Sequence, residues 1–189
     1  AGCSLAASIT AADVRLLREQ YPGAPVVTYV NTSAEVKAES DVCCTSANAV
    51  EVVESLNVPR VIFLPDEYLG KYVATQTKTE LVLWKGHCEV HERFTGDEIR
   101  SFRRQHPDVT VLAHPECPPD VLEASDYVGS TAGMVQHIGA VRPSRVVIGN
   151  YQEGAAVDGA VTDEAPPLED VVVGGPAPEP SVAEEPDAV

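Results

Sequence analysis

An internal repeat with a fixed interval of 85 residues constrains the fold of this chain more than any other feature. Cys88 follows Cys3 by this interval, and residues 1–64 can be laid over residues 86–149 without a gap. Identities in this register include Arg18 with Arg103, Gln20 with Gln105, Pro22 with Pro107, Val36 with Val121, Ser40-Asp41 with Ser125-Asp126, Val50 with Val135, and Arg60-Val61 with Arg145-Val146. So many identities in one register are not expected by chance, whereas duplication of one structural unit explains them directly. The two copies should therefore share one fold.

Each copy alternates short apolar runs with helix-like segments. The predicted strands are residues 24–30, 41–45, 60–64 and 81–84 in the first copy, and 109–113, 127–128 and 145–148 in the second. The predicted helices are residues 11–20, 35–40, 46–56 and 66–75, and then 95–105, 119–124 and 131–138. This alternation, with short loops, is typical of βαβ units around a parallel sheet. We predict an α/β fold of two pseudo-equivalent αβα units, residues 1–87 and 88–149.

The last segment, residues 150–189, differs from the rest in composition. It holds ten of the 29 acidic residues, no Lys or Arg, and many Gly, Ala and Pro residues. Such a segment buries too little apolar surface to offset its ordering entropy, so we predict that it is disordered. Much of the net charge of −16 lies there. The two units therefore have an ordinary acidic excess, which gives no electrostatic support to nucleic-acid binding.

Localisation signals are also missing from the sequence. No apolar run approaches the roughly 18 residues that a membrane span needs. The chain opens on Ala1-Gly2-Cys3 with no basic and apolar regions of a signal peptide. We expect a cytoplasmic protein with no membrane partner.

The five cysteines are expected to be reduced thiols, because their number is odd and no Cys-x-x-Cys motif occurs. Cys3 and Cys88 lie in the repeat register, so they would converge at the centre of repeated units. With a third cysteine they would form a three-thiolate site, in which a four-iron cluster keeps one iron open as a Lewis acid. The alternative is that each is a small buried hydrophobic residue. The cysteines outside the register, which we interpret as structural, are Cys43, Cys44 and Cys117.

The repeat interval also predicts what the chain lacks. A further interval after Cys88 leads to position 173, which is Val173 rather than a third cysteine. A chain that opens on the cysteine ending one unit implies a further copy before Ala1. The site would then need groups from outside this sequence.

Polar clusters follow four of the predicted strands, where doubly wound sheets place their ligands. They are Tyr29–Ser33, Thr45–Asn48, His114–Glu116 and Gly129–Thr131. The last opens a helix and so suits an anion bound by backbone N–H groups. The alternative is that the Ser, Thr and Asn residues are helix caps.

Histidines divide into one candidate for chemistry and several for packing. His114 and Glu116 could exchange protons near neutral pH, although a structural or surface pair is an equal reading. The histidines that we interpret as surface or packing residues are His87, His106 and His137.

Together these residues resemble a known family, quinolinate synthase, the iron-sulfur enzyme of NAD biosynthesis. The resemblance covers about residues 1–148, and its motifs are Ala1–Ala6, Tyr29–Ala38, Cys44–Val50, Pro65-Asp66, Leu69-Gly70, Trp84–Cys88, Val90-His91, His114–Cys117 and Gly129–Thr131. It implies three pseudo-equivalent αβα domains around a 4Fe-4S cluster with one cysteine per domain. Cys3 and Cys88 match two of these ligands. The chain would then be a partial version of a pseudo-threefold fold.

The resemblance also implies a reaction and roles for several residues. The family condenses iminoaspartate, produced by an aspartate oxidase or dehydrogenase, with dihydroxyacetone phosphate, and releases phosphate and water. Matched by motif, the substrate-binding residues are Tyr29, Asn31, Ser46, His91, His114, Glu116 and Thr131, and Glu116, His114 and Tyr29 are the catalytic candidates. Because a first domain and a C-terminal cysteine segment have no match, we expect an incomplete or inactive form of the enzyme.

Two alternatives come from other functional classes. The first is a non-catalytic αβ module that keeps an anion pocket at Ser130-Thr131 and holds no cluster. The second is a nucleophilic enzyme using Cys88 and His91, which we disfavour because the sequence indicates no oxyanion or orienting partner.

Overall fold

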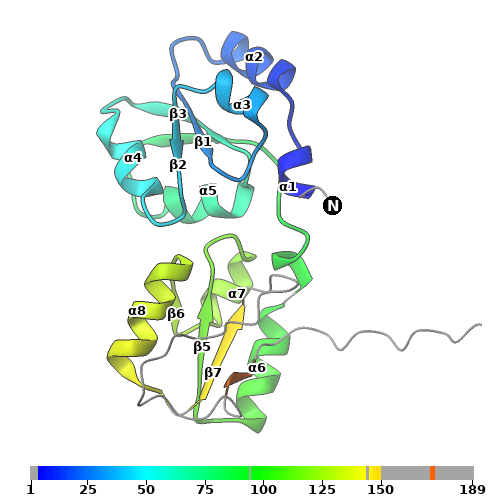
Figure 1. Cartoon of the computed structure of the whole chain (residues 1–189), viewed down its shortest axis with the longest axis vertical. Helices are drawn as coiled ribbons and strands as arrows, with labels where there is room; N and C mark the ends of the chain where they lie inside the picture. The colour runs from blue at the N-terminus through cyan, green and yellow to red at the C-terminus, as the bar shows by residue number, and fades with distance from the viewer. Residues whose placement is uncertain (1–3, 94, 144, 150–170, 173–189) are drawn as a thin grey trace, which may run out of the picture.

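A computed structural model describes residues 4–93, 95–143, 145–149 and 171–172 and contains two αβ units, one above the other in Figure 1. The first comprises α1 (Ser4–Ala7), α2 (Ala11–Gln20), β1 (Val26–Tyr29), α3 (Ala34–Ala38), β2 (Val42–Cys44), α4 (Ala49–Ser55), β3 (Arg60–Leu64), α5 (Glu67–Ala74) and β4 (Glu80–Leu83). The second comprises η1 (His91–Arg93), α6 (Gly96–Gln105), β5 (Val109–Ala113), α7 (Pro119–Glu123), β6 (Tyr127–Val128), α8 (Thr131–Val141), β7 (Arg145–Gly149) and β8 (Val171–Val172).

Both sheets are four-stranded and fully parallel. Their strand orders are β2-β1-β3-β4 and β6-β5-β7-β8. The pairing obeys the 85-residue interval: Val27 is opposite Val42 and Leu112 is opposite Tyr127. The predicted α/β class, with two units built on parallel sheets, is confirmed.

Strand β3 shows why the sheet of the first unit is covered on both faces. Val61 and Phe63 belong to one buried apolar cluster, and Ile62 and Leu64 belong to another on the opposite face. Successive side chains alternate between faces, so a wholly apolar strand needs helices on both sides. The same alternation at Leu112 and its neighbours divides the core of the second unit.

In both units an aspartate accepts a hydrogen bond from a backbone N–H of an inner strand, β1 or β5. Asp41 Oδ2 accepts hydrogen bonds from the Val26 N–H at 2.7 Å and from Arg18 at 2.8 Å. The Asp126 carboxylate likewise accepts from the Val111 N–H at 2.8 Å and pairs with Arg103 at 2.6 Å. These two pairs of identities in the sequence repeat, Arg18 with Arg103 and Asp41 with Asp126, are thus framework contacts.

Helix starts are repeated in the same way. Thr10 and Asp13 form a capping box at α2, and Thr95 and Glu98 form one at α6. In each, the threonine hydroxyl accepts a hydrogen bond from the backbone N–H of the acidic residue, and the carboxylate of that residue accepts one from the threonine N–H.

The structure adds elements that the sequence did not predict. These are α1, the single turn η1 after Cys88, and β8. Strand β8 lies inside the segment predicted to be disordered and pairs with β7, which precedes that segment. Residues 150–170 and 173–189, including Val173, lie outside the described residues, as does Cys3. Among the helices of the described ranges, none is long and apolar enough to cross a membrane.

Candidate active site

The carboxyl ends of strands from the two units come together, and several of the predicted site residues lie in this region. Tyr29 is the last residue of β1, and Ser46 lies just after β2. His114 directly follows β5 in the second unit, and its Nε2 lies 3.0 Å from Ser46 Oγ. This contact joins two segments that are 68 residues apart, so the site is formed by both units.

The turn after β5 buries two of the predicted residues. His114 and Glu116 are 5% and 3% exposed. The Glu116 N–H donates to His114 Nδ1 at 3.3 Å, and the Cys117 N–H donates to the His114 carbonyl at 2.9 Å. The turn therefore holds the imidazole with Nδ1 as an acceptor, which leaves its proton on Nε2.

The loop carrying Cys88 is held by Gly86. Gly86 forms a bridge with Asp66, and its carbonyl accepts from the Glu67 N–H at 2.7 Å. A Cβ at position 86 would collide with the Ser8 side chain and the Pro65 carbonyl, so the close approach requires glycine. The backbone then turns through η1, which brings His91 back beside Cys88.

Cys88 has the properties of a reactive thiol or a metal ligand. Its burial, at 9% exposure, would raise the pKa of the thiol, but hydrogen bonds and positive charge from His91 outweigh this effect and lower the pKa. By contrast, burial raises the pKa of Cys44 and of Cys117 to about 12. Those two thiols pack in the apolar cores, as expected of structural cysteines.

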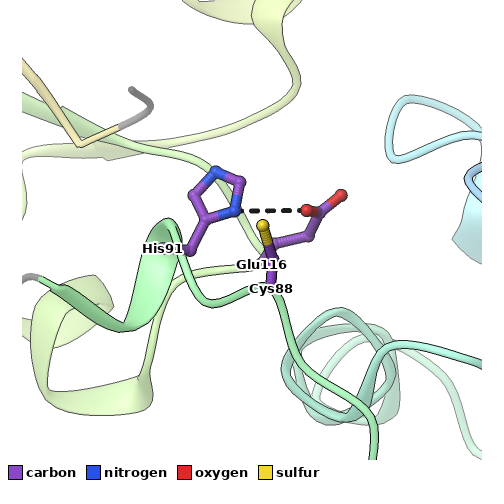
Figure 2. A group of neighbouring side chains, drawn as sticks. All are labelled: Cys88, His91 and Glu116. Carbon is purple, nitrogen blue, oxygen red and sulfur yellow. Dashed lines mark ion pairs between the residues drawn. The ribbon is translucent and has the colours of Figure 1, made fainter. Parts of the chain in front are cut away.

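His91 lies between two acidic groups. Its Nδ1 is 3.2 Å from Glu116 Oε2, and it also hydrogen-bonds the Cys88 side chain (Figure 2). Burial alone would lower the pKa of His91, but these two partners raise it to about 10. Burial also works against the ionised form of Glu116, yet His91 and the other donors around that carboxylate keep its pKa below the usual value. The pair is therefore an imidazolium and a carboxylate at neutral pH.

The second histidine has the opposite charge state. His114 stacks on His91 with ring centroids 5.3 Å apart, and burial lowers the pKa of His114 to about 4. A neutral His114 can donate its Nε2 proton to Ser46 Oγ. The two stacked histidines differ in protonation because hydrogen bonds to Cys88 and Glu116 offset the burial of His91, whereas the more distant Glu116 carboxylate, 3.8 Å from His114 Nδ1, does not offset the burial of His114.

Tyr29 completes a hydrogen-bonded network across the two units. Its hydroxyl bonds to Glu116 and Ser46, and burial, followed by the negative charge of Glu116, raises the pKa of Tyr29. The connection runs from His114 through Ser46 and Tyr29 to Glu116. Hydrogen-bonded groups in a buried setting can pass protons between neighbours, so this arrangement suits general acid–base chemistry.

Asp66 is a site residue that the sequence did not single out for a role. It is fully buried at the start of α5, where Oδ1 accepts from the Leu69 N–H at 2.6 Å. Oδ2 is buried with no hydrogen bond within the described part of the chain. Burial and the nearby Glu116 charge raise the pKa of Asp66 to about 7. Its place two residues after β3 was the available signal, but an N-cap aspartate looks the same in sequence.

A pocket of about 360 Å³ adjoins this network. It is lined by Ser46, Ala47 and Tyr72 from the first unit and by Tyr127, Val128, Gly129, Ser130, Ala132, Gly133 and Gln136 from the second. The start of α8 faces the pocket, and Ser130 caps this helix by accepting from the Gly133 N–H at 3.2 Å. Helix N-termini attract anions, so the pocket suits an anionic ligand.

Two predicted residues lie at the edge of this arrangement. Asn31 follows β1 and is partly exposed, and Thr131 is the exposed first residue of α8, next to Ser130 and Ala132 of the pocket. The histidines predicted to be surface or packing residues each contact an aromatic ring: His137 stacks on Tyr127, His87 stacks on Tyr68, and His106 lies against Phe102 with the two rings tilted.

Comparison with known proteins identifies a matching family and several relatives of this chain. The family described as "Quinolinate synthetase A protein" matches residues 1–154. Quinolinate synthase 2 of Mesorhizobium japonicum is 67% identical over 148 residues, which cover 78% of this chain and 46% of the relative. Quinolinate synthases of Agrobacterium fabrum and Xylella fastidiosa are 66% and 60% identical over 148 residues, covering 78% of this chain and 43% and 44% of the relatives. The chain thus spans less than half the length of these relatives.

Proposed function

Because the chain belongs to the quinolinate synthase family, we propose that it supplies part of the catalytic site that condenses iminoaspartate with dihydroxyacetone phosphate to quinolinate for NAD biosynthesis. The observation that carries this proposal is the hydrogen-bonded network of His114, Ser46, Tyr29 and Glu116, which crosses between the two units. Condensation with loss of water and phosphate requires repeated proton transfers. A network of neutral and charged groups, with His114 and Glu116 buried, meets that need.

Glu116 is the proposed proton-transfer residue. Its carboxylate is buried, ionised and hydrogen-bonded to His91 and Tyr29. It can therefore accept a proton from the substrate while hydrogen bonds from these two neighbours hold it in place. Tyr29 keeps its phenolic proton, and His114 is a neutral imidazole with a proton on Nε2. Both are therefore suitable hydrogen-bond donors to a substrate oxygen. In this proposal Glu116, His114 and Tyr29 are catalytic.

Substrate anions bind in the pocket beside this network. Both proposed substrates are anionic, and the pocket has the start of α8 and the hydroxyls of Ser46 and Ser130 on its wall. Asn31, Ser46, His91 and Thr131 complete the set of proposed substrate-binding residues. The pocket lies between the units, so closure of one unit on the other would exclude water.

Cys88 fits the 4Fe-4S cluster that the family implies, with Cys3 as the second protein ligand. The structural support is the lowered pKa of the Cys88 thiol, because iron ligation requires the thiolate. When bound, such a cluster supplies an iron that acts as a Lewis acid toward a substrate oxygen. The third ligand and the remaining substrate contacts come from outside residues 1–149 in this proposal.

The proposal extends to the cellular setting and the division of the chain. Iminoaspartate is unstable, so the protein works beside an aspartate oxidase or dehydrogenase that produces it, in the cytoplasm. In this proposal residues 1–87 and 88–149 act as two domains, and residues 150–189 follow them as an acidic tail, whose β8 pairs with β7 of the second unit.

The test is a chimera in which this chain replaces the matching segment of the Mesorhizobium japonicum relative. After anaerobic reconstitution, we expect cluster absorption and quinolinate formation from iminoaspartate and dihydroxyacetone phosphate. Cys88→Ser should remove the cluster, whereas Cys43→Ser, which alters an exposed thiol, should keep it. A chimera that folds, binds iron and sulfide and makes no quinolinate would contradict the proposed reaction.

A further inference from the structure

Three side chains of different chemistry converge at one point of the site. The donor atoms of Cys88, His91 and Glu116 all lie within 4.8 Å of one another (Figure 2). Two come from the loop that Gly86 holds in place, and the third comes from the turn after β5. A sulfur, a nitrogen and a carboxylate oxygen are the donor types that zinc binds in proteins.

The spacing of these donors suits a single small cation. Zinc binds nitrogen and oxygen at about 2.0–2.2 Å and sulfur at about 2.3 Å, so two donors on one tetrahedral ion lie roughly 3–4 Å apart. His91 Nδ1 and Glu116 Oε2 are already 3.2 Å apart. The thiol and the carboxylate lie on the side of the His91 ring that carries Nδ1 (Figure 2). Small side-chain rotations therefore bring all three donors to bonding distance.

Burial and charge favour the same conclusion. The His91 and Glu116 side chains are only 8% and 4% exposed. A thiolate and a carboxylate together have two negative charges, which a divalent cation neutralises, so the buried site has no net charge when occupied. A buried group of charges is tolerated when it is compensated in this way.

We propose that Cys88, His91 and Glu116 form a binding site for one divalent transition-metal ion, such as Zn²⁺, with a fourth position open to water. The ion takes the place of the proton that His91 shares with its two acidic neighbours. That proton and any proton on the thiol pass to solvent, because the ligands are the thiolate and the neutral imidazole.

This site differs from the cluster site of the proposed function. It uses one thiol together with a nitrogen and an oxygen, whereas an iron–sulfur cluster is held by several thiolates. It needs neither Cys3 nor sulfide, so it does not rest on the proposed reaction. The two sites share Cys88 and cannot be filled together. Zinc would then compete with cluster assembly on this chain.

The experiment is a Co²⁺ titration of the full 189-residue chain, reduced, treated with chelator, and free of iron and sulfide. We expect one Co²⁺ per chain, a thiolate-to-cobalt charge-transfer band in the near ultraviolet, and stoichiometric displacement by Zn²⁺. X-ray absorption of the zinc-bound wild type should show one sulfur and otherwise nitrogen or oxygen neighbours. Two or more sulfurs per zinc, or no saturable binding, would overturn the proposal.

Variants separate this site from the cluster. Cys88→Ser should abolish the charge-transfer band, and His91→Ala and Glu116→Gln should each weaken Co²⁺ binding at least ten-fold. The matched controls Cys43→Ser and Cys3→Ser should bind Co²⁺ as the wild type does. Failure of the cluster proposal would show in iron and sulfide analysis and leave the Co²⁺ results unchanged. A band that survives in Cys88→Ser, or unchanged affinity in both His91→Ala and Glu116→Gln, would rule the site out, and circular dichroism would identify any variant that had not folded.

Discussion

The two units share one framework but differ at the ends of their strands. Asp41 and Asp126 each accept from a backbone N–H of an inner strand, and the threonine caps of α2 and α6 coincide in the repeat. At the strand ends, the interval instead relates Tyr29 to His114 and Asn31 to Glu116.

This difference shows how a duplicated unit can produce a site. The strand ends of the two units contact each other, so identical side chains at both ends would offer the same groups to each other. Replacing tyrosine by histidine and asparagine by glutamate gives complementary donors and acceptors instead. The observed outcome is that Tyr29 and Glu116 are hydrogen-bonded to each other.

The largest expected effect is a loss of catalytic activity on substitution of Glu116, compared with substitution of Asn31, its equivalent in the repeat. In the chimera, Glu116→Gln should lower kcat/KM for quinolinate formation, measured with respect to dihydroxyacetone phosphate, about 100-fold or more, because the proton-transfer group is lost. Asn31→Ala should mainly raise KM, because it removes a substrate contact and no proton acceptor. Steady-state kinetics compare the two variants, and equal losses in kcat would mean that the strand ends are not specialised.

The second expected effect concerns the two buried carboxyls, Asp66 in the first unit and Glu116 in the second. The pKa of Asp66 is raised to about 7 from 3.8, so its stabilising contribution is full below pH 3.8 and is lost as the pH rises to about 7. The pKa of Glu116 is lowered from 4.5, so its contribution is full above pH 4.5 and is lost as the pH falls through the folded-state value.

Carboxyl carbon NMR of the metal-free chain measures both titrations. We expect Asp66 to titrate near neutral pH and Glu116 below pH 4.5. In the wild type, the free energy of unfolding should fall between pH 4 and 7 by roughly 1.4 kcal/mol for each unit by which the pKa of Asp66 is shifted. Asp66→Asn should remove this fall, because the amide does not titrate. Ordinary titration of both groups near pH 4 would show that the site does not bury them.

The framework aspartates should behave alike in the two units. Asp41→Ala and Asp126→Ala each remove the carboxylate that accepts from a strand N–H and from an arginine. We expect each to lower the free energy of unfolding by about 1–3 kcal/mol. Urea denaturation of both variants provides the comparison, and a large effect in one unit only would break the framework equivalence.

The helix caps give the smallest expected effect. Thr10→Ala and Thr95→Ala should each cost about 1 kcal/mol, because each removes one side of a capping box. Thr10→Ser and Thr95→Ser, which keep the hydroxyl, are the matched controls. Serine variants as unstable as the alanine variants would mean that the caps do not act through their hydroxyls.

The sequence predicted the fold well because the repeat and the apolar strands are local signals. Helix α2 matches its predicted residues 11–20, and α6 begins one residue after its predicted start at Thr95, which is the cap. It missed β8, since two valines in an acidic segment form a strand only through pairing with β7.

The site was predictable in its members but not in its electrostatics. Tyr29, Ser46, His91, His114 and Glu116 lie together, whereas their catalytic roles remain predictions. Nothing in the sequence distinguishes a charged His91 from a neutral His114, because this difference depends on contacts between distant segments. Asp66 looked like a cap, and only its burial beside Glu116 marks it as part of the site.

A double-mutant cycle between Tyr29→Phe and Glu116→Gln tests most directly the claim that the site is built across the two units. Urea unfolding of the wild type, the two single variants and the double variant gives the coupling energy. Direct hydrogen bonding between Tyr29 and Glu116 predicts a coupling of at least about 0.5 kcal/mol. Additive effects of the two substitutions would contradict the account.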